Sequence, residues 1–419
     1  MLRHGLRAFV ALSTLMLAQP VWADAAKPLA GQTISVLLPS GQRPGLAEDF
    51  EKETGIHVDL QSLSWNDIRA KLVTALLAGS APADVTEVDW SWTGQFGAAG
   101  WYAPLDGLLD EATVRDIATS PIFRYDGKLI ALPYNNDFRV LIVNKEHFDK
   151  AGISAMPKTL DELLAAARTL KEKGVSKYPI GIPLSPAEGT STAWYLLTKA
   201  FGGELFDKDF KPLFTDPSSA GHKALAFEID ALKQGLIDPA APGLIDMDVH
   251  QLFMDGQVSM EICGEVGRLA LFNDASKSKV AGKAVAALFP TASGVTRSLG
   301  LPEAMGIPVT SQKKEAALAF VKWMSAKEQQ LKNYTEAGTL ATRTSALEDL
   351  NKAGKLESGK VLIEQASTAG GLFPQGTPIW YPQFSSAVYT AINQAAKGQL
   401  SVDDALKQIA DETERAMQQ

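Results

Sequence analysis

Apolar residues follow two spacings that alternate along the chain. Residues 34–38 form a short apolar run, and residues 56–60 place an apolar side chain at every second position, both typical of β-strands. Residues 46–50 and 68–76 repeat apolar side chains at every fourth position, which predicts helices. Residues 85–88 predict another strand. This strand–helix–strand order predicts a mostly parallel sheet covered by helices.

The same alternation continues to the end of the chain. Strands are predicted at 129–132, 139–143 and 258–262, and a helix is predicted along Ala316, Phe320 and Trp323. Thr159 and Glu162 have the spacing of a capping box, and Ser401 opens the last helix in a similar way. No internal repeat or long linker is present, so we expect two lobes woven together by crossings rather than joined by a tether.

The first 23 residues have the pattern of a secretory signal peptide. Arg3 and Arg7 give a basic start, residues 8–18 form an apolar run, and cleavage is expected between Ala23 and Asp24. The run has about half of the roughly 20 apolar residues that a bilayer crossing needs. No cysteine lies near the cleavage site, so we expect a free protein in the periplasm rather than a lipid-anchored one.

Charge and size narrow the function further. The formal charge is −8, and loss of Arg3 and Arg7 with the leader, but of no acid, takes it to −10. An acidic protein has no electrostatic reason to bind nucleic acid or an anionic membrane. Cys263 is the single cysteine, which excludes a disulfide framework. The remaining chain exceeds the size at which one core stops growing, so two lobes are expected.

The sequence carries no enzyme signature. The five histidines are never three or four residues apart, and neither a GxxxxGK[ST] phosphate loop nor a GxSxG nucleophile turn occurs. Asp246-Met247-Asp248 begins like a calcium loop, but Gln251 and Gln257 stand where that loop needs Gly and Glu. A binding function is therefore favoured over catalysis, and we expect no metal and no cofactor.

Six segments resemble, in the same order, those of the extracellular solute-binding protein family 1, the maltose-binding-like proteins of ABC importers. The resemblance covers nearly all of the chain after the leader, with an extra Ala83 in the first segment. The segments are residues 78–85 (AGSAPADV), 97–106 (GAAGWYAPLD), 129–134 (LIALPY) with 143–145 (VNK), 253–260 (FMDGQVSM), 314–323 (KEAALAFVKW) and 398–406 (GQLSVDDAL).

The resemblance implies a type II periplasmic-binding-protein fold with two α/β lobes, each a mixed, mostly parallel sheet flanked by helices, and a ligand cleft between the lobes. It places the crossings near Asp137, Ser298 and Arg343. The N-terminal lobe would then comprise residues 24–137 and 298–343. The C-terminal lobe would comprise residues 138–297 and 344–419. Closure about the crossings would be a hinge motion biased by ligand contacts to both lobes.

A sugar site needs aromatic faces for the ring and planar carboxylates, amides or guanidinium groups for the hydroxyls. In the first lobe the candidates lie in loops after predicted strands, namely Ser40, Gln42, Arg43, Trp65, Asp89, Trp90 and Trp92. A solvated turn is the alternative for the first three, and core packing is the alternative for Trp65. Trp90 and Trp92 flank one serine, so we expect one of them at the cleft and the other in packing.

Asp137 is the strongest single candidate, because the resemblance puts a ligand-contacting acid at this crossing. Its neighbour Asn136 is a further candidate or a turn former. Arg139 offers the structural alternative of an ion pair with Asp137.

The remaining candidates follow from the resemblance in the second lobe and the third crossing. They are Thr190, Trp194, Gly264, Glu265, Arg343, Trp380 and Tyr381. Thr190 has N-capping as its alternative. Val266 stands where relatives often have tryptophan, which puts a maltose-type oligosaccharide in doubt. Trp380 and Tyr381 would replace that lost face, although the family's aromatic position itself falls at Ser385.

The function expected from these residues is capture of a carbohydrate by a monomer, for delivery to membrane permease subunits driven by cytoplasmic ATPases. Two other transport ligands remain open. A polyamine would suit Asp89, Asp137 and Glu265, and an anionic sugar or glycerol ester would suit Arg43 and Arg343. The alternative outside transport is a secreted enzyme acting on polysaccharide through paired carboxylates.

Overall fold

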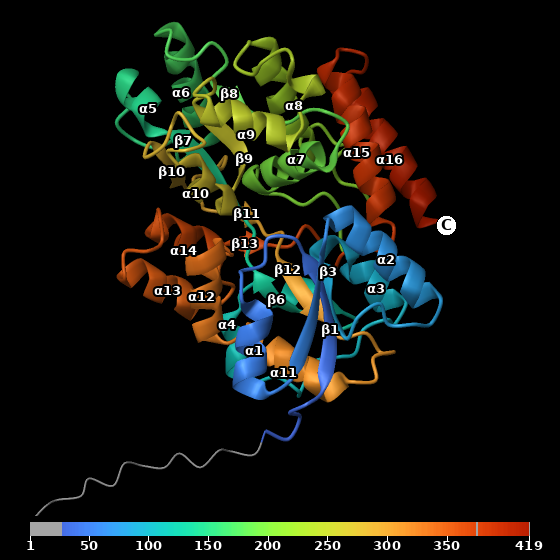
Figure 1. Ribbon diagram of the computed structural model, residues 1–419. Helices are drawn as coiled ribbons and strands as arrows, with labels where there is room; N and C mark the ends of the chain where they lie inside the picture. The colour runs from blue at the N-terminus through green and yellow to red at the C-terminus, as the bar shows by residue number, and fades with distance from the viewer. Residues whose placement is uncertain (1–26, 374–375, 419) are drawn as a thin grey trace, which may run out of the picture.

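The computed structural model describes residues 27–373 and 376–418, without the side chains of Trp65 and Asn66. The predicted signal peptide and its cleavage site lie outside these ranges. Two sheets form the centres of the lower and upper halves of the molecule in Figure 1. Within the described ranges, no helix combines the length and apolarity that a membrane crossing requires.

The first sheet lies in the lower half and has the strand order β2-β1-β3-β12-β6. Its strands are β1 (Thr33–Pro39), β2 (His57–Leu63), β3 (Val85–Asp89), β6 (Leu132–Asn135) and β12 (Glu303–Gly306). β1 runs parallel to β2 and β3, whereas β12 runs antiparallel to β3 and β6. The surrounding helices are α1 (Leu46–Thr54), α2 (Trp65–Leu77), α3 (Thr93–Ala98), α4 (Glu111–Asp116), α11 (Lys314–Met324) and α12 (Lys327–Ala337).

The second sheet lies in the upper half and has the order β10-β7-β9-β8. Its strands are β7 (Arg139–Asn144), β8 (Ile180–Gly181), β9 (Met260–Glu265) and β10 (Ala284–Ala287). Its helices are α5 (Lys145–Lys150), α6 (Leu160–Glu172), α7 (Glu188–Ala200), α8 (Ala220–Lys233), α9 (Asp246–Met254), α10 (Leu269–Phe272), α15 (Tyr381–Ala396) and α16 (Val402–Met417). The first sheet has two parallel and two antiparallel pairings, and here only β8 and β9 are parallel, so the expectation of mostly parallel sheets fails, most clearly in this half. The reason is β7, which enters from the other sheet and runs antiparallel to both of its neighbours.

Two segments that pass between the sheets are paired with each other. Phe138 bridges Gly300 in antiparallel fashion, and Leu301 N donates to Asp137 O at 2.7 Å. Beside them, β11 (Ser298–Leu299) pairs in parallel with β13 (Ala369–Gly370). The chain therefore changes sheets immediately before β7 and again before β12. Division of the chain into lobes at 137, 298 and 343 stays a prediction.

The helices α13 (Thr344–Lys352) and α14 (Gly359–Ser367) touch both halves. Asp116 of α4 accepts a hydrogen bond from the backbone of Ser345 at the start of α13. At the other end, Ala286 N donates to Ser358 Oγ and Phe289 N donates to Gln365 Oε1. This pair of helices is thus a third connection between the halves.

Most predicted elements are confirmed, with two shifts. The apolar run at 129–132 is divided between β5 (Lys128–Leu129), which pairs with β4 (Arg124–Tyr125), and β6. β9 starts at Met260 rather than 258, where the backbone N–H groups of Ser259 and Met260 both donate to Pro179 O, in the residue before β8. The segment that begins like a calcium loop is helix α9. In the described ranges no cluster of three or more His, Cys, Asp or Glu is arranged to hold a metal ion.

The predicted capping box at α6 is present. Glu162 N donates to Thr159 Oγ1 at 3.2 Å, and Thr159 N donates to Glu162 Oε2 at 3.1 Å. Thr159→Ala is expected to lower the free energy of unfolding by about 1 kcal/mol, because it leaves a helix N–H without its acceptor. Urea denaturation followed by circular dichroism measures this. Thr169→Ala, in the last turn of the same helix, is the control and should change stability by less; equal losses would contradict the capping role.

Candidate functional site

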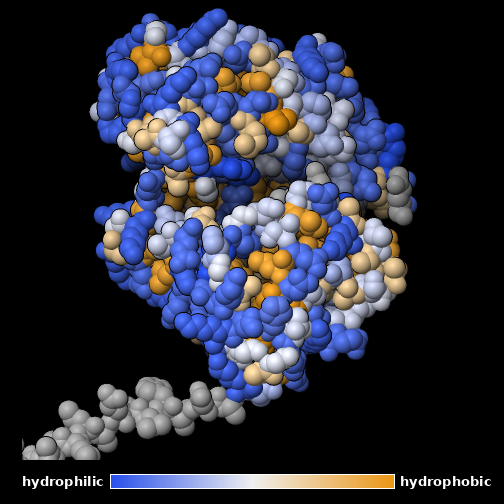
Figure 2. Space-filling model, in the orientation of Figure 1, coloured by the Kyte–Doolittle hydropathy of each residue, from blue (hydrophilic) through white to orange (hydrophobic). Residues whose placement is uncertain are grey.

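A cavity of about 620 Å³, called the central cavity below, lies between the two halves, where the surface in Figure 2 is hollowed. Its wall on the side of the first sheet is formed by Arg69, Asp89, Trp90, Ser91, Trp92 and Glu303. The opposite wall is formed by Glu188, Thr192, Glu265, Arg268, Tyr381, Pro382 and Tyr389. The crossing segments contribute Asp137, Arg139 and Leu301. The central cavity therefore combines aromatic rings with both signs of charge.

The aromatic part of the wall is a turn that follows strand β3. Asp89 caps the short 3-10 helix Trp90–Trp92 by accepting a hydrogen bond from Ser91 N at 2.9 Å. Trp90 meets Tyr381 of α15 edge to face, with ring centroids 5.0 Å apart. Trp92 packs on Phe96 at 5.6 Å, yet it also borders the central cavity. The expectation that only one tryptophan faces the cleft is therefore wrong, because the tight turn projects into the concave space.

Two acids lie opposite each other in the first sheet, where strand β3 ends and strand β12 begins. Glu303 begins β12 and lies directly opposite Asp89 on β3, with Asn135 of β6 on its other side. Asn135 Nδ2 donates to Glu303 Oε2 at 3.2 Å. Burial raises the pKa of Asp89 to about 7, and burial likewise raises the pKa of Glu303. The sequence analysis predicted Asp89 as a site residue from its position after a strand, but it did not predict Glu303.

The acid at the first crossing belongs to an ionic chain. Arg139 Nη1 donates to Asp137 Oδ1 at 3.0 Å, and Arg139 Nη2 lies 3.8 Å from Glu265 Oε1. Arg268 Nε donates to Glu265 Oε2 at 2.9 Å. The structural alternative for Arg139, an ion pair with Asp137, is thus present. Asp137 and Glu265 still border the central cavity, each about one quarter exposed.

The two carboxyl groups of this ionic chain, Glu265 and Asp137, have pKa values shifted in opposite directions. Although burial opposes it, the cations His250, Arg139 and Arg268 hold the pKa of Glu265 below its usual range. Burial raises the pKa of Asp137 despite its contact with Arg139. Glu265 is therefore a fixed negative charge in the cavity wall. His250 lies behind it, buried, with Nδ1 2.7 Å from Glu261 Oε1.

The helix α15 supports a further acid on the far wall. Ser385 Oγ donates to Glu188 Oε2 at 2.6 Å, and the Tyr381 hydroxyl donates to the other oxygen of the same carboxylate. Ser385, where the family's aromatic was expected, thus orients an acid instead of stacking on a ligand. Tyr381 borders the central cavity as predicted from its sequence position.

A smaller cavity of about 400 Å³ adjoins the first through Arg268 and Glu303. The loop after β1 lines it with Ser40 and Gln42. Ser40 is exposed and donates to Leu63 O at 3.3 Å, while Gln42 Nε2 donates to Pro39 O at 3.2 Å. Both side chains are therefore near the cleft, although outside the central cavity.

Two arginine candidates lie in ion pairs away from both cavities. The buried side chain of Arg43 pairs with Asp49 at 2.6 Å and donates to Asn333 Oδ1 at 2.7 Å. Arg343 Nε donates to Asp116 Oδ2 at 2.7 Å. Both therefore contact partners far along the chain instead of the cleft, which leaves the anionic-ligand alternative without these cations.

Five other candidates pack inside the halves: Asn136, Thr190, Trp194, Gly264 and Trp380. Trp194 is fully buried, and its Nε1 donates to Gly221 O at 2.8 Å. Thr190 does not cap α7, because the N-cap position is Ala187 and the Thr190 hydroxyl donates to Ser185 O. A Cβ on Gly264 would lie 2.6 Å from Ile142 Cγ1, so this glycine serves strand packing.

The two remaining packed candidates, Trp380 and Asn136, also contact protein groups rather than the cavity. Trp380 meets Phe206 and Phe210 edge to face, each at 5.4 Å. Asn136 Nδ2 donates to Ala341 O at 3.4 Å and is buried. Trp65 starts α2, but its side chain lies outside what the structure describes.

Sequence reasoning missed several residues of the cavity wall, namely Arg69, Glu188, Arg268, Glu303 and Tyr389. Glu303 had a usable signal, since it is an acid that follows the predicted crossing near Ser298. Arg69 and Tyr389 lie within helices whose apolar spacing shows only which face packs. Nothing in the sequence aims either side chain at the cleft.

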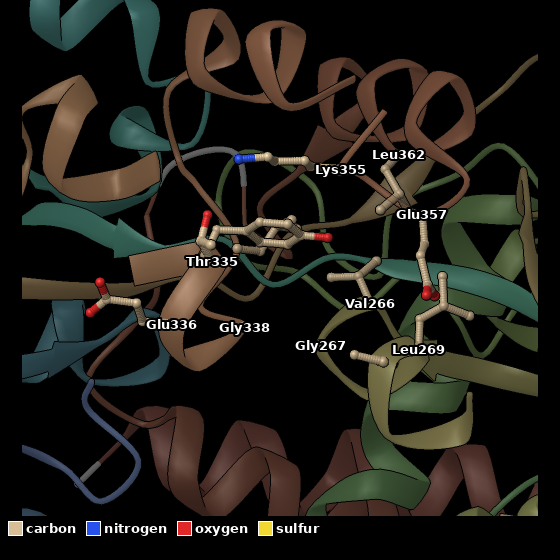
Figure 3. A pocket seen from close by; sticks show the side chains of 12 residues that line it. Val266, Gly267, Leu269, Thr335, Glu336, Gly338, Lys355, Glu357 and Leu362 are labelled. Carbon is tan, nitrogen blue, oxygen red and sulfur yellow. The ribbon is translucent and has the colours of Figure 1, made fainter. Parts of the chain in front are cut away.

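A third hollow, of about 520 Å³, lies where α12 approaches α10 (Figure 3). Val266, Leu269 and Leu362 give it apolar walls, and Glu336 and Lys355 lie at its side. Its lining includes Glu336 and Glu357 but, among the described residues, no counterpart to the paired tryptophans of the central cavity. We therefore take the central cavity as the candidate ligand site.

Two α/β halves, linked by paired crossing segments and enclosing a polar, aromatic cavity, define a binding protein that holds a small solute between lobes. Comparison with known proteins agrees. The family described as bacterial extracellular solute-binding protein matches residues 39–331, and the chain belongs to that family.

Individual relatives extend over most of the chain. A probable amino-acid ABC transporter periplasmic-binding protein of Sinorhizobium fredii is 29% identical, covering 91% of this chain and 88% of its own. A mannitol-binding protein of Pseudomonas aeruginosa is 26% identical over 97% of both. A solute-binding protein of Thermotoga lettingae, solved with α-D-tagatose, is 26% identical with a TM-score of 0.77, covering 92% of this chain and 100% of its own.

The different positions of Arg43 and Arg69 predict different roles. Arg43→Ala is expected to lower the free energy of unfolding by about 2–3 kcal/mol, because it leaves the buried acceptors of Asn333 and Gln329 without their donor. Arg69→Ala, at the half-buried cavity wall, should cost less than about 1 kcal/mol. Urea denaturation of both variants distinguishes the roles, and similar losses would contradict this assignment.

Proposed function

We propose that this protein captures a carbohydrate, from a monosaccharide or polyol to a short oligosaccharide or derivative, by hinge closure, and delivers it to an ABC transporter permease. The observation that carries the proposal is the central cavity, into which both halves of the molecule send hydrogen-bonding and aromatic groups. Carboxylates such as Asp89 accept hydrogen bonds from hydroxyl groups. The ring of Trp90 covers the apolar face of a sugar or polyol.

The ligands for which two relatives are named support the proposed carbohydrate ligand. Mannitol and tagatose are small polyhydroxylated ligands of the size that such a cavity holds, and they belong to proteins that span nearly the whole chain. The relative from Sinorhizobium fredii is named for amino acids instead. Arg139 and Arg268 of the cavity wall are paired with Asp137 and Glu265, which argues against ligands that are recognised chiefly through an anionic group.

Closure would take place about the crossing segments near Asp137, Ser298 and Arg343, with the lobes divided as residues 24–137 with 298–343 and 138–297 with 344–419. Contacts from a ligand to both walls would favour the closed state, since a ligand shifts a conformational equilibrium by its difference in affinity for the two states. We propose that the protein acts as a monomer in the periplasm after cleavage between Ala23 and Asp24, and that it does not turn over its ligand.

A ligand panel tests this function. D-mannitol, D-sorbitol, D-tagatose, D-mannose and maltose are each added to the purified protein, and the melting temperature is followed. A ligand at 100 times its dissociation constant should add about 2.7 kcal/mol to the stability of the protein. Small-angle scattering with the stabilising compound should show a smaller radius of gyration. Spermidine serves as the comparison, and stabilisation by spermidine alone would overturn the carbohydrate assignment.

Trp90 is expected to contribute a large part of the affinity. Trp90→Ala should raise the dissociation constant for the stabilising sugar about tenfold or more, because it removes both the stacking face and a partner of Tyr381. Isothermal titration calorimetry measures the change. Trp101→Ala is the matched control, since Trp101 packs on Phe96 outside the central cavity. Equal losses of affinity in both variants would show that the effect is only structural.

A further inference from the structure

Three carboxyl groups in the wall of the central cavity accept hydrogen bonds from neutral donors. Asp89 accepts from Ser91 N and its hydroxyl, and Glu188 accepts from the hydroxyls of Tyr381 and Ser385. Glu303 accepts from the Asn135 amide at 3.2 Å. Within the described residues none of the three has an ion pair with Lys, Arg or His.

The cations of the cavity wall are engaged elsewhere. Arg139 pairs with Asp137 and approaches Glu265, and Arg268 pairs with Glu265. Arg69 Nη2 donates to Gln95 Oε1 at 3.0 Å. The two paired acids are thus compensated within the protein, whereas none of the described cations is paired with the other three.

Acidic side chains are most concentrated on strands β3 and β12, in the middle of the first sheet. Asp89 and Glu303 are direct cross-strand neighbours, and Glu87 lies on the same face of β3 two residues before Asp89. Like charges placed directly opposite on adjacent strands repel each other. The single hydroxyl proton of Tyr134 lies between Glu87 Oε2 at 2.7 Å and Glu303 Oε2 at 3.0 Å. It can therefore be donated to only one of them at a time.

Closure of the cavity makes this repulsion stronger, because water is removed and charges interact more strongly at low dielectric. A neutral sugar supplies hydroxyl donors to these carboxyl groups but no positive charge to offset their repulsion. An ammonium group would instead supply positive charge and three N–H donors at once. The ring of Trp90 borders the same cavity, and aromatic rings attract cations.

We propose that the solute carries a protonated amine beside its hydroxyl groups, and that the ammonium lies among Asp89, Glu188 and Glu303 next to Trp90. The ligand class is an amino sugar or an amino polyol. This inference rests on the proposed carbohydrate function and narrows its ligand.

Calorimetric titration of matched pairs tests the inference. D-glucosamine, D-galactosamine, D-mannosamine and D-glucamine are compared with D-glucose, D-galactose, D-mannose and D-sorbitol. At least one amine should bind about tenfold or more tightly than its neutral counterpart, and raised salt should reduce that advantage. N-acetylation of the preferred amine, which removes its charge, should abolish the advantage.

Variants locate the effect. Asp89→Asn and Glu303→Gln should each remove most of the amine's advantage while changing the affinity of the neutral counterpart by less. Asp59→Asn, an exposed acid of β2, is the control and should leave both affinities unchanged. Amine selectivity that persists in both cavity variants would overturn the proposed position.

The two proposals fail in different ways. If neutral sugars or polyols bind as tightly as their amine counterparts, or more tightly, the ammonium inference is wrong and carbohydrate capture stands. If neither the charged nor the neutral hydroxylated compounds bind, both proposals are wrong.

Discussion

The pairing of the two crossing segments is the constraint on which the rest of the structure depends. Because Leu301 N donates to Asp137 O and Phe138 bridges Gly300, the chain passes between sheets at one shared place. Glu303 follows this pair into the first sheet, and Arg139 leaves it into the second. Short connections keep the residues beside them close to the hinge whatever the angle between the halves. The acids and the arginine of the cavity wall are therefore positioned by the backbone of the paired crossing segments.

Charge around this hinge is divided unevenly. On the side of the second sheet, Glu265 has Arg139 and Arg268 beside it and remains ionised. On the side of the first sheet, Asp89 and Glu303 have only neutral donors and pKa values raised by burial. A ligand that contacts both walls therefore meets a fixed, compensated carboxylate on one side and titratable acids on the other.

The sequence predicted local features well, because their causes are local. Apolar spacing gave β1, α1 and α2, the Thr159–Glu162 spacing gave a capping box, and the loop after β3 gave Asp89 with its tryptophans. It could not predict the direction of Arg43, whose partner Asn333 is 290 residues away. The position of Glu303 opposite Asp89 likewise follows from strand pairing between segments far apart in the chain. Long-range partners, rather than residue type, decide which loop side chains face the cleft.

Helix α7 illustrates why a resemblance places contacts more reliably in loops than along helices. All but the first of its 13 residues are buried, so almost every face of the helix packs against protein. Only its first turns reach the cavity wall, where Glu188 and Thr192 lie. Trp194, two residues further on, points away, into contact with Phe214 and the carbonyl of Gly221. In a helix buried on all sides, a shift of two residues turns a side chain by more than half a turn. An alignment that is correct to within a few residues therefore identifies the contacting turn without identifying the contacting residue.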